Sequence, residues 1–144
     1  MRGQGMPRFL LVDDYAIVRR GLREILGEEY PKACFGEASD GQEALELIES
    51  KGWDLILLDI SMPGIGGFEV LKEMRRRRLS TPVLILSVHP ESEFLARALR
   101  AGAGGYVTKQ SPPEVLTGAV RKLLRGTVHE PHAGRADGAR VGGR

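Results

Sequence analysis

Short apolar runs alternate along the chain with segments whose apolar residues recur every three or four positions. The short runs predict buried strands of a parallel sheet, because such strands are apolar on both faces. They are Phe9–Val12, Ala33–Ala38, Asp54–Asp59, Pro82–Ser87 and Gly104–Thr108. The periodic segments predict helices that bury one face. They are Tyr15–Leu26, Gln42–Glu49, Phe68–Arg78, Glu91–Arg100 and a last helix starting at Pro112–Glu114. Five strand–helix alternations indicate a doubly wound α/β domain.

Three local signals are expected to mark the ends of these elements. Asp14 is expected to cap the first helix, because an aspartate side chain accepts hydrogen bonds from the first free backbone N–H groups. Gly27 is expected to end the same helix. The segment Met62–Gly67 predicts a loop, since proline and clustered glycines break both periodicities.

Charged residues close several of the apolar runs. Asp13 and Asp14 follow the first, Asp59 closes the third and Lys109 follows the fifth. The carboxyl ends of parallel strands meet at one edge of a sheet, where such domains bind ligands. Three acids there form an oxygen-rich site for a hard divalent cation such as Mg2+. A cation, a lone aspartate and a lysine are the parts needed to phosphorylate a carboxylate.

Each of these residues taken alone also has a plainer interpretation. Asp13 and Asp14 would be a helix cap and a solvated acid, and Asp59 a turn residue. Lys109 would be a solvated strand end, and Ser87, at the end of the fourth run, a cap for the fourth helix. Together these interpretations require four independent coincidences, so the pattern favours a shared site.

Composition narrows the class of protein. The chain has 144 residues, of which 42% are apolar and 28% charged, as in a single soluble domain with a real core. Its net charge of +2 is too small to indicate nucleic-acid binding, and Arg75–Arg78 are predicted to be a solvated helix end. Cys34 cannot form an internal disulfide and is predicted to be a small core residue, which favours a reducing cytoplasm. The apolar stretches are far shorter than the roughly 20 residues that span a bilayer, so no membrane contact is expected.

Together, these motifs resemble the receiver domain of two-component response regulators. The residues that carry the resemblance are Asp13-Asp14, Asp59 followed by Met62-Pro63-Gly64, Ser87, and Tyr106 before Lys109. The run from Asp13 to Leu22, and Ser111–Leu116 after Lys109, are similar to the NarL/FixJ (LuxR-type) group. The resemblance covers residues 8–125 and implies a flavodoxin-like five-stranded parallel sheet, (βα)5, in the order 2-1-3-4-5. Residues 1–7 would be an N-terminal extension, and 126–144 a disordered linker or a non-native tail.

The resemblance also implies a role for each site residue. Asp59 would be the phosphoacceptor. Asp14, Asp59 and the backbone carbonyl of Ser61 would bind Mg2+, and Asp13 would orient water molecules on the metal. Lys109 would pair with a phosphoryl oxygen or with the free Asp59 carboxylate. Ser87 would hydrogen-bond another phosphoryl oxygen, and Tyr106 would follow Ser87 inward as a switch.

The partners follow from the same resemblance. The phosphoryl donor would be the phosphohistidine of a sensor histidine kinase, and the chain would be a phosphoacceptor that assists its own phosphorylation and dephosphorylation rather than an enzyme. A homodimer would use helix one with helix five, or helix four with strand five and helix five. DNA would be bound only through a C-terminal helix-turn-helix domain, which members of the group usually carry and which is absent from these 144 residues.

Two alternatives stay open. The chain could be a degenerate receiver that acts as a constitutive interaction module, although its intact acid set argues against this. It could also be a small phosphohydrolase with an aspartate nucleophile. That class has a second aspartate two residues after the first, where this chain has Ser61.

Overall fold

The computed structural model describes residues 6–50, 52–88 and 92–126. Strands and helices alternate as β1 (Arg8–Val12), α1 (Ala16–Glu29), β2 (Cys34–Ala38), α2 (Gly41–Ser50), β3 (Leu55–Asp59), α3 (Gly67–Arg76), β4 (Val83–Ser87), α4 (Ser92–Arg100), β5 (Gly105–Thr108) and α5 (Pro113–Leu124). The strands form one parallel sheet in the order β2-β1-β3-β4-β5. This confirms the predicted flavodoxin-like architecture. Within the described residues, no helix is both long and apolar enough to cross a bilayer.

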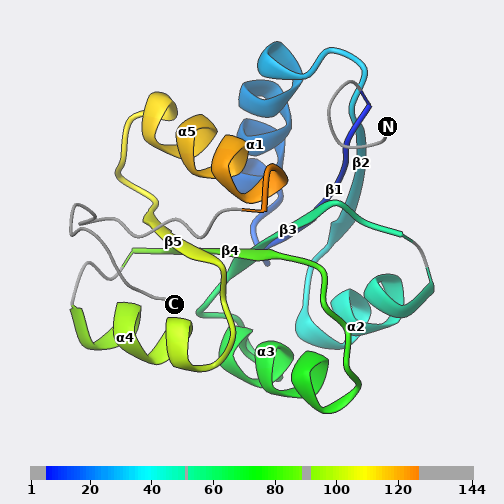
Figure 1. Ribbon diagram of the computed structural model, residues 1–144, viewed down its shortest axis with the longest axis vertical. Helices are drawn as coiled ribbons and strands as arrows, with labels where there is room; N and C mark the ends of the chain where they lie inside the picture. The colour runs from blue at the N-terminus through cyan, green and yellow to red at the C-terminus, as the bar shows by residue number, and fades with distance from the viewer. Residues whose placement is uncertain (1–5, 51, 89–91, 127–144) are drawn as a thin grey trace.

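The sheet separates two apolar cores. Helices α1 and α5 cover one face, and α2, α3 and α4 cover the other (Figure 1). Side chains alternate between the faces along each strand, so Phe9 and Leu11 pack with α1 and α5 while Leu10 and Val12 pack on the opposite side. All five residues of β3 are buried, because this strand lies in the middle of the sheet. Each such aliphatic side chain contributes roughly 1.5–3 kcal/mol to the stability of the fold.

Both predictions about the ends of the first helix are wrong. Helix α1 runs through Gly27 to Glu29, because Leu26 is fully buried and Tyr30 packs against Phe9 with ring centroids 5.5 Å apart. These contacts outweigh the roughly 1 kcal/mol that a glycine costs inside a helix. The N-cap residue is Tyr15, and no side chain caps α1. Asp14 is therefore not a cap.

The prediction that Cys34 is a core residue is also wrong, because Cys34 is exposed. It is the first residue of β2, an edge strand with only β1 beside it, so little of the molecule covers the thiol. Further along the same strand, the Trp53 ring lies against Gly36, where an added Cβ would come within 2.3 Å of it.

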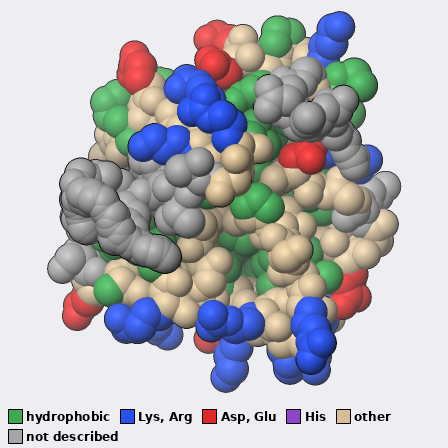
Figure 2. Space-filling view, viewed as in Figure 1, with side chains coloured by type: hydrophobic (Ala, Val, Ile, Leu, Met, Phe, Trp, Pro, Cys, Tyr) green, Lys and Arg blue, Asp and Glu red, His purple; other side chains and the backbone are tan. Residues whose placement is uncertain are grey.

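The arginine run lies at the end of α3, as predicted, although the helix ends at Arg76 rather than Arg78. Arg76 and Arg77 pair with Glu73, and Arg77 also pairs with Glu49. Figure 2 shows Lys and Arg side chains along the edge of the molecule where α3 and α4 lie. The predicted helix start at Glu91 and the tail from residue 127 onward lie outside the described residues, as do residues 1–5.

Candidate functional site

Four neighbouring strands end at the edge of the sheet that carries the predicted site. Asp13 and Asp14 follow β1, Asp59 ends β3, Ser87 ends β4 and Lys109 follows β5. Carboxylate oxygens of the three aspartates all lie within 4.8 Å of one another. The sheet order explains this clustering, because β1 and β3 are adjacent and parallel and their carboxyl ends lie side by side.

Lys109 bridges the two buried carboxylates. Its Nζ donates to Asp13 Oδ2 at 2.8 Å and lies 3.3 Å from Asp59 Oδ1. Its backbone N–H also donates to the Ser87 carbonyl at 2.7 Å, which fixes the start of the β5–α5 loop against β4. The lysine thus pairs with both Asp13 and Asp59. Its shorter contact, with Asp13, was not expected.

Asp59 sits in an environment that disfavours its charge. The residue is 3% exposed, and burial together with the nearby Asp13 raises the pKa of its carboxyl from 3.8 to about 6. Lys109 and the Ser61 N–H, which donates to Asp59 Oδ1 at 3.3 Å, oppose this increase. The carboxyl is still mostly ionised at neutral pH and can therefore act as a nucleophile.

The two members of the acid pair differ in what holds them. Asp13 is fully buried, and its Oδ1 accepts the Tyr15 N–H at 2.9 Å while its Oδ2 accepts from Lys109. Asp14 is half-buried, and its Oδ1 is a buried atom without a hydrogen-bond partner. A buried carboxylate oxygen with no donor is costly unless something else binds it.

These acids fit a divalent cation. Carboxylates are the hard oxygen ligands that Mg2+ prefers. Asp14, whose Oδ1 is buried without a hydrogen-bond partner, belongs to this cluster, and three carboxylates with one ammonium carry a formal charge of −2 that a divalent cation would balance. Asp13, Asp14 and Asp59 are therefore the residues that would hold the metal.

The loop between β3 and α3 brings its backbone close to Asp59. Gly64 adopts a φ of +72°, which favours glycine. A Cβ on Gly67 would lie 2.7 Å from the Asp59 carbonyl oxygen, so only glycine lets α3 begin this close to the end of β3. Ser61 lies on this loop and is exposed.

Ser87 and Tyr106 lie next to the acids. Ser87 is fully buried at the end of β4, directly opposite Thr108 in the sheet register. It is not a cap for α4, which begins at Ser92. Tyr106 is 2% exposed and belongs to the core beneath α3 and α4. Its side chain is thus already inward in this structure.

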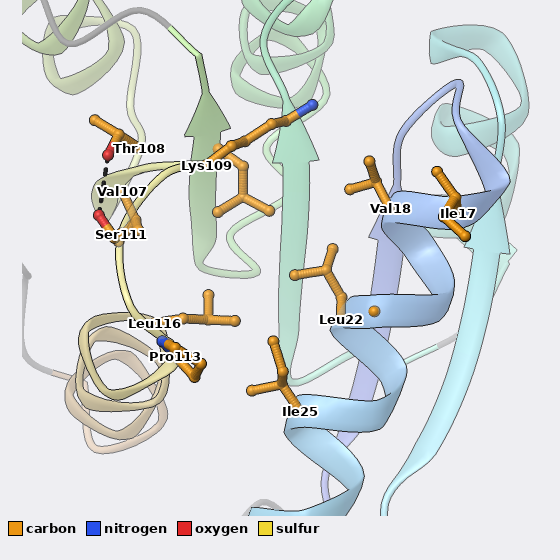
Figure 3. Close-up of a pocket in the computed structure, with 12 residues that line it drawn as sticks. Ile17, Val18, Leu22, Ile25, Val107, Thr108, Lys109, Ser111, Pro113 and Leu116 are labelled. Carbon is orange, nitrogen blue, oxygen red and sulfur yellow. Dashed lines mark hydrogen bonds between the residues drawn. The ribbon is translucent and has the colours of Figure 1, made fainter.

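An apolar groove of about 210 Å³ lies beside the site, between α1 and α5. Ile17, Val18, Leu22 and Ile25 line it from α1, and Leu116 lines it from α5. Lys109 stands at its border and extends away from Leu116 (Figure 3). The residues that line the groove include no acid, and Lys109 connects the groove to the acidic cluster.

One residue that contacts the acid pair was missed by the sequence reasoning. Arg19 on α1 donates from Nη1 to the Asp13 carbonyl oxygen at 2.6 Å and from Nε to Glu37 Oε1 at 2.7 Å. The only signal in the sequence is its position next to Val18, on the border of the apolar stripe of α1. That position predicts a partly buried cation but not its partners.

Comparison with known proteins gives a consistent result. The family model described as "Response regulator receiver domain" matches residues 9–121. The response regulator UvrY of Escherichia coli strain K12 is 37% identical over 121 residues, which are 84% of this chain and 56% of UvrY. The chain thus spans a little over half the length of this relative.

Comparison with solved structures also finds response regulators. A two-component response regulator of the LuxR family from Aurantimonas sp. SI85-9A1 superposes with a TM-score of 0.80 at 37% identity, covering 86% of this chain and 89% of that one. The response regulator TrrA from Thermotoga maritima, solved in complex with Mg2+-BeF, superposes with a TM-score of 0.73 at 36% identity, covering 82% and 99%.

Proposed function

Because this chain belongs to the response regulator receiver domain family, we propose that Asp59 accepts a phosphoryl group from the phosphohistidine of a sensor histidine kinase. In this transfer the phosphorus–nitrogen bond of the donor breaks, and a bond forms between phosphorus and an Asp59 carboxylate oxygen. The observation that carries the proposal is the cluster itself, a buried aspartate at the end of the central strand, among two further carboxylates and a lysine.

Each neighbour of Asp59 has a part in the proposal. Lys109 already lies 3.3 Å from Asp59 Oδ1, so its ammonium is placed to pair with a phosphoryl oxygen on that carboxylate. Ser87 would donate its hydroxyl to another phosphoryl oxygen. Mg2+, held by Asp13, Asp14, Asp59 and the Ser61 carbonyl, would neutralise the charge of the transferred group.

Phosphorylation would act through the strands that carry these side chains. Lys109 is tied through its backbone to Ser87, and Ser87 faces Thr108 across the β4–β5 register. A new anion on Asp59 would attract both Lys109 and Ser87, and so bias the β4–α4 and β5–α5 connections. Tyr106 would report this change as the switch residue. The output would be transcriptional, since the structural neighbours include a regulator of the LuxR family.

The direct test is the intact mass of the protein after incubation with acetyl phosphate and Mg2+. We expect one phosphoryl group per chain, no labelling in Asp59→Asn, and loss of labelling in the parent when a chelator is added. Asp54→Asn is the matched control, because Asp54 immediately precedes the opposite end of the same strand and accepts a hydrogen bond from the Arg8 N–H. Labelling of Asp59→Asn would refute the assignment.

The mass measurement, together with an assay of phosphate release from a phosphate ester, separates the two alternatives. A degenerate receiver would show no labelling in the parent. A phosphohydrolase would show continued release of phosphate from an ester substrate, well beyond one turnover per chain. Stoichiometric labelling by acetyl phosphate, without sustained turnover of a phosphate ester, supports the receiver.

A further inference from the structure

Arg19 connects three elements around the acid pair. It lies on α1, its side chain is 15% exposed, and its guanidinium donates both to the Asp13 carbonyl oxygen and to Glu37 on β2. Glu37 thereby holds the guanidinium through its Nε, while another nitrogen of the same group reaches the Asp13 carbonyl. The result is a charge-assisted hydrogen bond to a backbone carbonyl at the end of β1.

Every other polar group of Asp13 is also held. Its N–H donates to the Ala38 carbonyl at 3.1 Å, and its two carboxylate oxygens accept from the Tyr15 N–H and from Lys109. The Asp13 carbonyl belongs to the peptide that leads into Asp14. Holding this carbonyl therefore sets the orientation of the Asp14 backbone, and Asp14 Oδ1 has no hydrogen bond of its own to orient it.

We propose that Arg19 is a positioning residue for the metal site. It acts through the Asp13 carbonyl to direct the Asp14 carboxylate toward the cation, and Glu37 holds its guanidinium in place. The inference rests on the proposed function, because it concerns binding of Mg2+ to this acid cluster. Partners of metal-ligating groups commonly change metal affinity by 10- to 100-fold when they are removed.

Charge and positioning predict opposite results at this residue. Arg19 is a cation near the acidic cluster, so removing its charge alone should tighten the binding of Mg2+. Removing a positioning contact should instead weaken binding, because the Asp14 carboxylate is then free to leave its orientation. The direction of the change in Kd therefore distinguishes the two effects.

Arg23 is a matched control on the same helix. It lies one turn after Arg19, and its Nε is 3.6 Å from the other carboxylate oxygen of Glu37. Its side chain is 46% exposed. Arg23→Met removes the same charge and one partner of Glu37, but the contacts of Arg23 are with Glu37 and with the ring of Phe35, both on β2.

The experiment measures the Kd for Mg2+ by calorimetric titration of the full chain, together with the free energy of unfolding in urea without metal. We expect Arg19→Met and Arg19→Lys each to raise the Kd roughly 10-fold, since lysine keeps the charge but cannot donate to both partners at once. Arg23→Met should stay within about twofold of the parent. Should Arg19→Met fail to fold, Arg19→Lys alone carries the test.

A double-variant cycle tests the part of Glu37. Glu37→Ala should weaken Mg2+ binding in the parent and weaken it less in the Arg19→Met background, because both residues act through the same carbonyl. An unchanged or lower Kd in both Arg19 variants overturns the proposal, as does a loss of stability without any change in Kd. A parent that binds no Mg2+ would refute the proposed function instead.

Discussion

Replacing Asp59 by asparagine should stabilise the metal-free protein at neutral and alkaline pH. Burial and the neighbouring Asp13 raise the pKa of the Asp59 carboxyl from 3.8 to about 6 in the folded protein. The folded state therefore binds more protons than the unfolded state between these two values. As the pH rises through this window, the free energy of unfolding of the parent must fall.

The magnitude follows from the size of this shift. One pKa unit corresponds to about 1.4 kcal/mol, so a shift from 3.8 to about 6 destabilises the folded parent by about 3 kcal/mol above pH 7. Asparagine carries no charge and keeps an oxygen that can accept the Ser61 N–H. Lys109 keeps its shorter contact with Asp13 Oδ2 at 2.8 Å. We therefore expect Asp59→Asn to be more stable by about 2–3 kcal/mol at pH 8 and nearly equal to the parent at pH 4.

Urea unfolding followed by circular dichroism, from pH 4 to pH 8 with a chelator present, measures the difference. Glu46→Gln is the control, because Glu46 is an exposed carboxylate on α2, and its effect should stay within about 0.5 kcal/mol. Addition of Mg2+ at pH 8 should stabilise the parent more than Asp59→Asn and so narrow the difference. An offset that does not change with pH, or a parent that is the more stable at pH 8, would refute the reasoning.

Three further outcomes are expected. Lys109→Ala should retain Mg2+ but lose most labelling by acetyl phosphate, whereas Asp14→Ala should lose the metal first. Calorimetry measures metal binding and intact mass measures labelling in each variant. Equal losses of metal affinity in both variants would contradict this division of roles. Ser87→Ala should still be labelled but respond less in any conformational or dimerisation signal that phosphorylation changes in the parent, and a full response would exclude Ser87 from the switch. Trp53 should keep nearly constant fluorescence during a Mg2+ titration, because it precedes β3 at the end away from Asp59. At ~3.3 Å per residue, Trp53 lies about 20 Å from Asp59. Strong quenching that saturates with the metal would contradict that placement.

The sequence by itself determined the fold and the edge at which the acids meet. Apolar runs that end in charge are a local signal, readable without any knowledge of contacts. Parallel strands with helical crossovers place their carboxyl ends on one edge of the sheet. Asp13, Asp59 and Lys109 therefore had to approach one another once the five alternations formed. The roles assigned to these side chains stay predictions, because they concern a phosphoryl group and a metal rather than the chain.

Only the tertiary structure decided which local signals prevailed and which partners each charge found. Gly27 lies inside α1 because contacts of Leu26 and Tyr30 with the core outweigh the glycine's preference for a helix end. Cys34 is exposed because β2 became the edge strand, which depends on the order of the sheet and not on the residue.

The Asp13 side chain accepts from Lys109, 96 positions away in the chain, and its carbonyl accepts from Arg19. Propensity and periodicity act over a few residues, whereas a buried charge takes whichever counter-charge the packing of distant elements brings within hydrogen-bond distance. For this reason the sequence indicated where the site would be, and the folded chain alone determined what holds its acids in place.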